Sequence, residues 1–465
     1  MCEGLSMPEP ESVDVIVVGA GLEGLLLATE LACGGLRVTL VERRAEGGGR
    51  CRADREEGFT FPRSIRLARY GTYGSLGEIL FRQGDSTPLL ELGKSYALYS
   101  GGVTALPLGL RFAFPTRLVG ARDQLRIARL ILRLRSAADA TSVEDLDAWM
   151  TSEGIVGRLA QLLRSIAGTM TMRADPGRLA AREVLEALRR SLDLGISMAY
   201  PAEGWAALAR SALDRFRSHG GELRCECRAD RIRIARGRVL GIASASGESL
   251  DGSKVVWTAD PRRLRAAVEQ LDPAMDRAIG TVRPVAATSL ALALSEPVST
   301  TTGLWRIDSP NSWAFFASNI AGSLAPRGKQ LLLACAPMEA GSASVGATAE
   351  ALESRLCELF PGLAERIEHR RFRAIDRLHG SDVGANATRS HRPPVRAAAP
   401  RGLFVVGDAC AAAGLGPDIG FSSARRCVNT ILGDRASLPP PEVDVATEAG
   451  SAAKRRRKRR IRAEH

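Results

Sequence analysis

An apolar strand that runs into a glycine-rich turn near the start of the chain constrains the fold more than any other feature. Residues 15–18 are all apolar, which is typical of a buried parallel strand, and the glycine turn at residues 19–24 follows at once. Apolar residues then recur at helical spacing through 22–33, and a second apolar run, 37–41, ends at Glu42. This order of strand, turn, helix, strand and acid predicts a dinucleotide-binding unit of the Rossmann type.

Each glycine of the turn has its own structural reason. Gly19 permits the tight turn, Gly21 lets a pyrophosphate approach the backbone, and Gly24 lets the helix pack closely on the strand. The free N–H groups of the helix N-terminus favour an anion there. Glu42 lies 23 residues after Gly19, where a carboxylate can accept hydrogen bonds from both ribose hydroxyls. The alternative is a glycine-rich turn in an α/β unit that binds no dinucleotide.

A second motif lies shortly after this acid. Gly48, Gly49 and Arg50 follow Glu42 within one short loop. A pyrophosphate carries two charges that one helix N-terminus offsets only in part, and a guanidinium can bind such an anion with two hydrogen bonds. The arginine is therefore a second element for binding a pyrophosphate, one that NAD enzymes do not need.

A third motif lies near the other end of the chain. Residues 402–406 are predicted to form a strand, and Gly407 and Asp408 form the turn after it. The glycine-rich loop 414–420 comes next, and we expect a helix to begin at Phe421. Together the three motifs resemble the superfamily of FAD-dependent amine oxidases and phytoene desaturases, which includes the protoporphyrinogen oxidases.

The resemblance implies FAD as the cofactor and assigns a role to several residues. Arg50 would contact the dinucleotide, and Asp408 would accept a hydrogen bond from the polyol chain of the flavin. The helix that begins at Phe421 would point at the pyrimidine edge of the flavin ring, and the backbone of Ala229 would touch the adenine. No catalytic side chain and no metal ligand is assigned. The expected cofactor-binding residues are Gly19, Gly21, Gly24, Glu42, Gly48, Gly49, Arg50, Ala229, Gly407, Asp408 and Gly420.

The resemblance also implies an α/β fold with an interrupted layout. A Rossmann-type FAD-binding domain would be assembled from separated segments, with an interleaved α+β substrate domain. The helical part of that domain should hold helices near 118–136, 143–166 and 177–190. We expect FAD-binding segments at 12–90, 200–270 and 396–435, a largely helical substrate segment at 91–199, a sheet-and-helix substrate segment at 271–395, and a disordered linker with a basic tail at 436–465.

The segment beside the flavin ring departs from the family pattern. Residues 58–61 fit it, but Pro62 stands where the family has an acid and Ser64 where it has a glycine. No lysine falls in the motif that amine oxidases often place near the flavin N5 atom. We therefore favour an FAD-dependent oxidoreductase that desaturates or dehydrogenates a lipophilic, isoprenoid- or carotenoid-like substrate by hydride transfer to N5. The alternatives are an amine or porphyrinogen oxidase that uses oxygen, and a flavin-binding protein without turnover.

Composition limits the other classes of function. No apolar stretch is long enough to span a bilayer, and the N-terminal residues lack a signal-peptide pattern. The nine cysteines form no CxxC pair. We therefore expect a cytoplasmic protein with reduced thiols. Cys225 and Cys227 would share one strand face, but no ligand-spaced partner supports a metal there.

The net charge of +12 is concentrated at the C-terminus. Residues 454–465 carry eight Lys or Arg, which we interpret as a solvated tail; binding to nucleic acid or anionic lipid, or a targeting role, is the alternative. The rest of the chain has no basic patch interleaved with aromatics, so we expect a small-molecule substrate and no nucleic-acid partner. Nothing in the sequence indicates an oligomeric state.

The pattern of residues 122–135 generates a test of membrane contact. Arg122, Arg126, Arg129 and Arg133 share one stripe of a predicted helix, and the rest of its surface is mostly apolar. One interpretation is a helix packed on the substrate domain; the other is an amphipathic helix at a membrane surface, through which a lipophilic substrate reaches the site. The second predicts that a chain truncated after Leu438 floats with anionic liposomes at low salt.

The matched variant replaces both Leu130 and Leu134 with Asp, and it should no longer float while keeping its flavin content. Removal of the basic tail from every sample ensures that the tail does not mimic the effect. Failure of the truncated chain to bind liposomes of any composition would contradict the membrane hypothesis and favour a water-soluble substrate.

Overall fold

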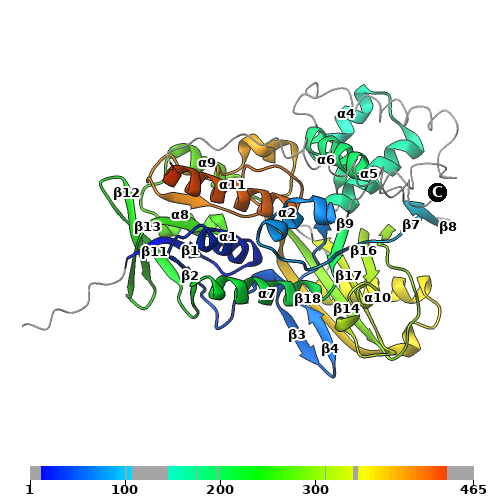
Figure 1. The fold of residues 1–465 in the computed structure, drawn as a ribbon. Coiled ribbons are helices and arrows are strands. Elements are labelled where there is room, and N and C mark those ends of the chain that lie inside the picture. Colours follow the sequence, from blue (N-terminus) through cyan, green and yellow to red (C-terminus); the bar gives the residue numbers. More distant parts are fainter. Residues whose placement is uncertain are drawn as a thin grey trace, which may run out of the picture.

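Two seven-stranded sheets, each with its own helices, form the framework of the protein (Figure 1). The computed structural model describes residues 12–99, 102–106, 145–173, 175–195, 198–308, 311–338 and 344–436.

The first sheet carries the glycine turn. Its strands are β1 (Val13–Val18), β2 (Val38–Val41), β10 (Glu222–Arg224), β11 (Ala229–Ala235), β12 (Arg238–Ser244), β13 (Ser249–Trp257) and β19 (Leu403–Val405). The strand order is β10-β2-β1-β13-β12-β11, and β19 also pairs with β13. The pairs among β10, β2, β1, β13 and β19 are parallel, and β11 and β12 extend the sheet in antiparallel fashion. Three stretches that lie far apart in the sequence therefore build one sheet.

Helix α1 (Leu22–Cys33) lies in the interior of this first unit. Every residue from Leu22 to Ala32 is buried, which fits a helix that is apolar on most of its surface. It packs against α7 (Gly204–Ser218) and α11 (Pro417–Ala436), and Figure 1 shows α1 between these two helices. The N-terminus of α1 is thereby fixed at the carboxyl end of β1, where the glycine turn lies.

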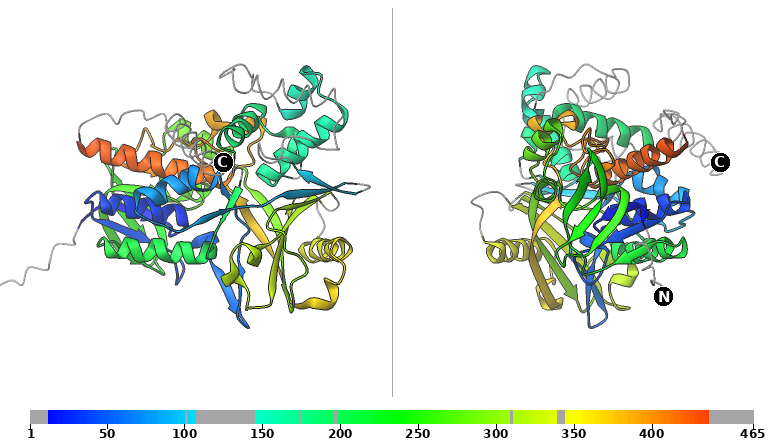
Figure 2. Two further views of the ribbon diagram at one scale, coloured as in Figure 1. Left: turned by 45° about the vertical axis from the view of Figure 1, so that its right-hand side comes forward. Right: turned by 90° about the vertical axis from the view of Figure 1, so that its left-hand side faces the viewer.

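The second sheet is formed mostly by later parts of the chain. Its strands are β7 (Ser95–Tyr99), β8 (Gly102–Leu106), β14 (Val285–Leu294), β15 (Trp305–Asp308), β16 (Asn311–Phe316), β17 (Gln330–Met338) and β18 (Ile367–His379). The order is β18-β14-β17-β16-β15-β7-β8. Strands β7 and β8 pair as an antiparallel hairpin, and Figure 2 shows it as the extension of a sheet whose other strands come some 200 residues later.

Strand β14 connects two hydrophobic cores because its side chains alternate between the faces of the sheet. Leu290, Leu292 and Leu294 belong to a core that includes Leu352 of helix α10 (Val345–Leu359). The intervening alanines of β14 belong to the core of the first unit. The alternation of leucine and alanine along this strand therefore places leucine on one face and alanine on the other.

Shorter elements complete the description. A ribbon of β3 (Ala53–Glu56) and β4 (Phe59–Pro62) follows the second glycine motif, and a small sheet has the order β5-β9-β6. The remaining elements are β5 (Ala68–Arg69), β6 (Leu89–Glu91), β9 (Met198–Pro201), α2 (Ser75–Arg82), α4 (Leu146–Ser152), α5 (Gly157–Thr171), α6 (Ala181–Leu194), α8 (Pro261–Ala267) and α9 (Pro273–Gly280).

Several predicted element boundaries were wrong. Helix α11 begins at Pro417 and not at Phe421, because proline is well suited to a first helical turn. The helix predicted at 143–166 is two helices, α4 and α5, interrupted near Gly154, which has a positive φ. Cys225 and Cys227 do not share a strand face, because β10 ends at Arg224.

Two of the sequence predictions lie outside the described residues, namely the helix at 118–136, which contains the amphipathic segment 122–135, and the C-terminal tail. Among the residues that are described, no helix has both the length and the apolar character needed to cross a membrane.

The close approach of α1 to β1 generates a prediction about stability. A Cβ atom added at Gly24 would lie 2.3 Å from the carbonyl oxygen of Gly19, so Gly24→Ala forces helix and strand apart. We expect the free energy of unfolding to fall by about 2–3 kcal/mol, measured by urea denaturation. Gly322→Ala is the matched control, because an added Cβ there meets nothing within 4 Å. An equal effect of the two substitutions would contradict the packing explanation.

Candidate functional site

The glycine turn and the second glycine motif pack directly against each other. Gly19 has a φ of 109°, and its N–H donates to the carbonyl of Val41. The N–H of Gly48 donates to the carbonyl of Ala20 at 2.7 Å. A Cβ added at Gly49 would lie 2.9 Å from the Cα of Gly21, so this contact requires glycine. The two motifs, separate in the sequence, thus form one surface at the N-terminus of α1.

Glu42 ties the end of β2 to this surface. Its carboxylate is buried and accepts hydrogen bonds from the backbone N–H groups of Ala20, at 3.0 Å, and of Arg44, at 3.1 Å. The N–H of Cys227 donates to the backbone carbonyl of Glu42, which brings the start of β11 at Ala229 to the same side of the sheet. Ala229 and Glu42 are therefore neighbours at one end of the site.

Five charged residues from different parts of the chain meet at the other end of the glycine turn. This charge cluster consists of Glu23, Arg50, Arg66, Arg377 and Asp408. Asp408 accepts from Arg50 at 2.6 Å and from Arg377 at 2.9 Å. Glu23 accepts from Arg66 at 2.6 Å, and the guanidinium of Arg50 lies 3.5 Å from the same oxygen. The cluster joins the two sheets, because Arg377 is on β18 and Asp408 directly follows the β19 strand region.

The arginines of the cluster hold its carboxylates ionised. Burial alone would raise the pKa of Asp408, but the charges of Arg50 and Arg377 outweigh it, and the pKa lies well below its usual range. The pKa of Glu23 is lowered in the same way, with Arg66 and Arg50 overcoming the effect of burial. His379, next to the cluster, is neutral, because burial lowers its pKa to about 3.

Arg66 is the most deeply buried cation of the cluster. Its guanidinium lies 5.5 Å from the ring centre of Trp205 and 5.8 Å from that of Phe421. The indole N–H of Trp205 donates to the backbone carbonyl of Arg66 at 2.8 Å, which fixes the segment. Every residue from 64 to 70 is buried, so this segment closes one end of the site.

The structure brings together most of the residues expected from the sequence, and it adds three. A Cβ added at Gly420 would lie 3.1 Å from a carboxylate oxygen of Glu23, so the first turns of α11 pack on the cluster. Sequence reasoning missed the roles of Glu23, Arg66 and Arg377. The available signal for Arg66 was an arginine inside the otherwise apolar run 65–68, whereas Arg377 lies in a strand rich in arginine and gave no signal.

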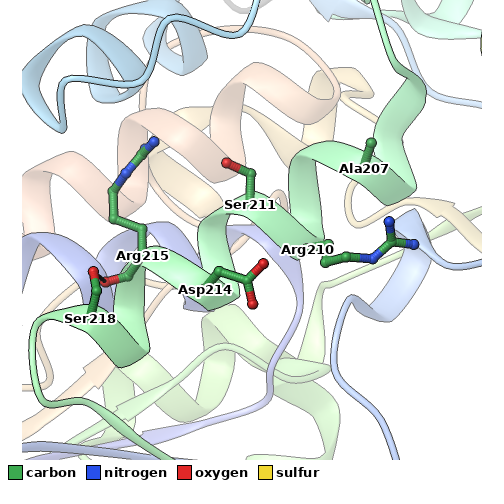
Figure 3. A pocket seen from close by; sticks show the side chains of 6 residues that line it. All are labelled: Ala207, Arg210, Ser211, Asp214, Arg215 and Ser218. Atoms are coloured by element: carbon green, nitrogen blue, oxygen red, sulfur yellow. Dashed lines mark hydrogen bonds between the residues drawn. The ribbon is translucent and has the colours of Figure 1, made fainter.

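A depression on the surface of α7 is a separate feature (Figure 3). Its lining comes from that helix alone and shares no residue with the charge cluster. The side chains of Asp214 and Arg215 stand along it, and Arg215 also pairs with Asp85 at 2.7 Å. Because no second element closes this depression, it supports no ligand-binding argument. The lining residues are Ala207, Arg210, Ser211, Asp214, Arg215 and Ser218.

The charge cluster generates a prediction about stability and pH. Asp408→Asn leaves Arg50 and Arg377 without their buried partner and should lower the free energy of unfolding by about 3–5 kcal/mol at neutral pH. Since the folded-state pKa of Asp408 is depressed, its contribution is present above its unfolded pKa and is lost as the pH falls toward the folded value. The difference between wild type and variant should therefore shrink below about pH 4.

The measurement is urea denaturation across a pH series. Asp276→Asn is the matched control, because Asp276 pairs with Arg265 at 2.7 Å in an exposed position, where such pairs contribute about 0–1 kcal/mol. A gap between wild type and Asp408→Asn that stays constant down to pH 2 would contradict the electrostatic origin of the effect.

Known proteins resemble this chain both in sequence and in fold. An all-trans-retinol 13,14-reductase from Macaca fascicularis is 36% identical over 74 residues, which are 16% of this chain and 12% of that protein. A lycopene-forming phytoene desaturase from Pseudescherichia vulneris is 25% identical over 275 residues, covering 53% of this chain and 55% of the relative. The matched regions therefore span about an eighth of the first relative and about half of the second.

The fold is also found in solved structures. The crystal structure of an oxidoreductase from Methanosarcina mazei matches with a TM-score of 0.75 and 20% identity over 89% of this chain and 99% of that one, which shows a shared fold. The profile of one family, described as flavin containing amine oxidoreductase, matches residues 24–432. This chain, with its Rossmann-type glycine turn and its charge cluster, belongs to the family of flavin containing amine oxidoreductases.

Proposed function

We propose that the protein is an FAD-dependent oxidoreductase that desaturates or dehydrogenates a lipophilic, isoprenoid- or carotenoid-like substrate. Family membership implies a flavin cofactor. The carrying observation for the substrate is that relatives matched in sequence are named for phytoene and for retinol, both of them isoprenoids. A bound flavin would supply the N5 atom that accepts a hydride. The chain itself must hold the cofactor, orient the substrate and exclude water.

The adenosine and pyrophosphate part of FAD fits the residues present. Among the described residues, a Cβ added at Gly21 would meet only a carboxylate oxygen of Glu23, at 3.6 Å, so there is space beside this backbone, with the Glu23 carboxylate at its edge. The side chains of Arg50 and Arg377 are 22% and 19% exposed, and both guanidinium groups pair with the carboxylate of Asp408. The residues that would hold this part are the glycine turn, Glu42 and Arg50, with Arg377 as an additional cation, and Asp408 would bind the adjoining polyol chain.

The ring end of the site, residues 64–70 with the first turns of α11, contains buried polar atoms that no group of the described residues satisfies. They include Ser64 Oγ, Arg66 Nε, and Nε and one Nη of Arg69. Unsatisfied buried polar groups are rare and costly, and a bound group with carbonyl oxygens and ring nitrogens would satisfy them. The composition of this region therefore suits a polar heterocycle, although protein side chains pack closely in it.

The proposed substrate class also bears on where the protein works. We propose a cytoplasmic protein that meets the membrane surface through residues 122–135, because an isoprenoid would otherwise have to cross water. On this view the small-molecule substrate enters from the lipid phase, and no nucleic acid is involved. The support is the sequence pattern of that segment.

A second candidate function is a flavin-binding protein without turnover. The observation that favours it lies in the segment beside the expected ring position. Pro62 and Ser64 replace the acid and the glycine of the family pattern, and Arg66 fills the space between Trp205 and Phe421. Such a protein would bind the dinucleotide, while the flavin would not accept a hydride from a substrate.

Anaerobic flavin reduction tests the two candidates. The purified yellow protein is mixed without oxygen with phytoene in detergent micelles, with a primary amine or with a porphyrinogen, and the visible flavin absorbance is followed. We expect phytoene to bleach the flavin, because it is an apolar substrate that can donate a hydride. Bleaching by the amine or porphyrinogen alone, reversed by air, would replace the proposal with an oxidase.

Empty micelles are the control for light- or detergent-driven reduction. If dithionite reduces the flavin but no substrate does, the binding protein without turnover is favoured. A colourless protein that takes up no FAD would overturn both candidates.

A further inference from the structure

The two ends of the candidate site differ in accessibility. At the pyrophosphate end, the side chains of Arg50 and Arg377 are 22% and 19% exposed, and there is space beside the backbone of Gly21. At the ring end, Arg66 is 2% exposed and Phe421 is 1% exposed. A ligand can therefore reach the pyrophosphate end in this conformation, whereas the ring end is filled by the protein's own side chains.

One ion pair is responsible for this closure. Glu23 lies in the first turn of α1, where its carboxylate is favoured by the helix N-terminus, and it accepts from Arg66 at 2.6 Å. The pair is nearly inaccessible, with side-chain exposures of 7% and 1%. The Arg66 guanidinium lies within cation–π distance of Trp205 and Phe421, so it occupies the space between α7 and α11.

The packing buries Arg66 and leaves one of its hydrogen-bond donors unpaired within the described part of the chain. Among the described residues, its Nε atom has no hydrogen-bond partner, and neither has the hydroxyl of Ser64 two residues earlier. Arg69, from the same buried segment, has two guanidinium nitrogens with no partner in that part of the chain. Unpaired buried donors cost free energy, so a rearrangement that pairs them stabilises the segment. A polar ring that enters this space would supply acceptors for such a rearrangement.

We propose that Glu23 and Arg66 form a latch that closes the ring end of the site, so that Arg66 determines which nucleotides bind tightly. This rests on the proposed function, in that it takes FAD as the cofactor. An ADP moiety binds with the latch closed, because it needs only the glycine turn, Glu42 and Arg50. The flavin ring enters only when the Arg66 side chain leaves Glu23.

The latch predicts a smaller difference between the affinities for FAD and ADP than an open pocket would give. In a preformed pocket, the buried ring adds contacts, and FAD binds far more tightly than ADP. Here the entry of the ring separates a buried ion pair and removes the guanidinium from two aromatic faces, which offsets the new contacts. The wild-type protein should therefore discriminate weakly between FAD and ADP.

The test is calorimetric titration of the nucleotide-free, full-length protein with ADP and with FAD. We expect the two wild-type dissociation constants to agree within about threefold. In the double variant Glu23→Gln, Arg66→Ala, which leaves the net charge unchanged, FAD should bind at least about tenfold more tightly than to wild type, with little change for ADP. A shift of the visible flavin spectrum on binding reports, independently of activity, that the ring has left water.

The matched control is Arg63→Ala. Arg63 directly precedes the buried segment 64–70, but its side chain is 36% exposed and pairs with Asp54 away from the cluster, so both affinities should stay at the wild-type values. If wild type already binds FAD about tenfold more tightly than ADP, the latch is wrong and the cofactor assignment stands. If neither nucleotide binds, the cofactor assignment fails and the latch fails with it. The ratio of the wild-type dissociation constants for ADP and FAD tests the latch even if the double variant does not fold.

Discussion

Asp408 is the point on which the two halves of the structure depend. It accepts hydrogen bonds from Arg50, 358 residues earlier in the chain, and from Arg377 at the end of the second sheet. A fully buried carboxylate is stable only when cations and donors surround it, so the first sheet, the second glycine motif and β18 must all be in place. The requirement to neutralise one buried charge thereby fixes the relative positions of three distant segments.

The same arrangement explains why the site lies at the junction of the two units. Hydrophobic packing alone would hold β14 and α10 together, and it would hold α1 against α7 and α11, but it is not directional. The hydrogen bond from Arg50 to the carbonyl of Leu378 is directional, and so are the contacts to Asp408. Charged groups therefore set the register between the units, while apolar burial supplies most of the stability.

The cations of the cluster also differ in how deeply they are buried. Arg50 and Arg377 each pair with Asp408 while their side chains stay partly exposed, at 22% and 19%. Arg66 is different, because its side chain is 1% exposed and its guanidinium is enclosed by Glu23, Trp205 and Phe421. Burial thus separates the cations into two with partly exposed side chains and one that is enclosed.

The sequence by itself determined the elements whose physics is local. The strand, glycine turn, helix and acid of residues 15–42 could be predicted because backbone geometry and apolar periodicity act over a few residues, and α1 has the bounds that were predicted. The family resemblance placed Arg50 and Asp408 at one site. Only the tertiary structure decided that Glu23, Arg66 and Arg377 join them, because a buried ion pair depends on distances between segments that no local pattern records. For the same reason the sequence showed only that Pro62 and Ser64 depart from the family pattern, and the structure showed that Arg66, two residues after Ser64, packs between Trp205 and Phe421.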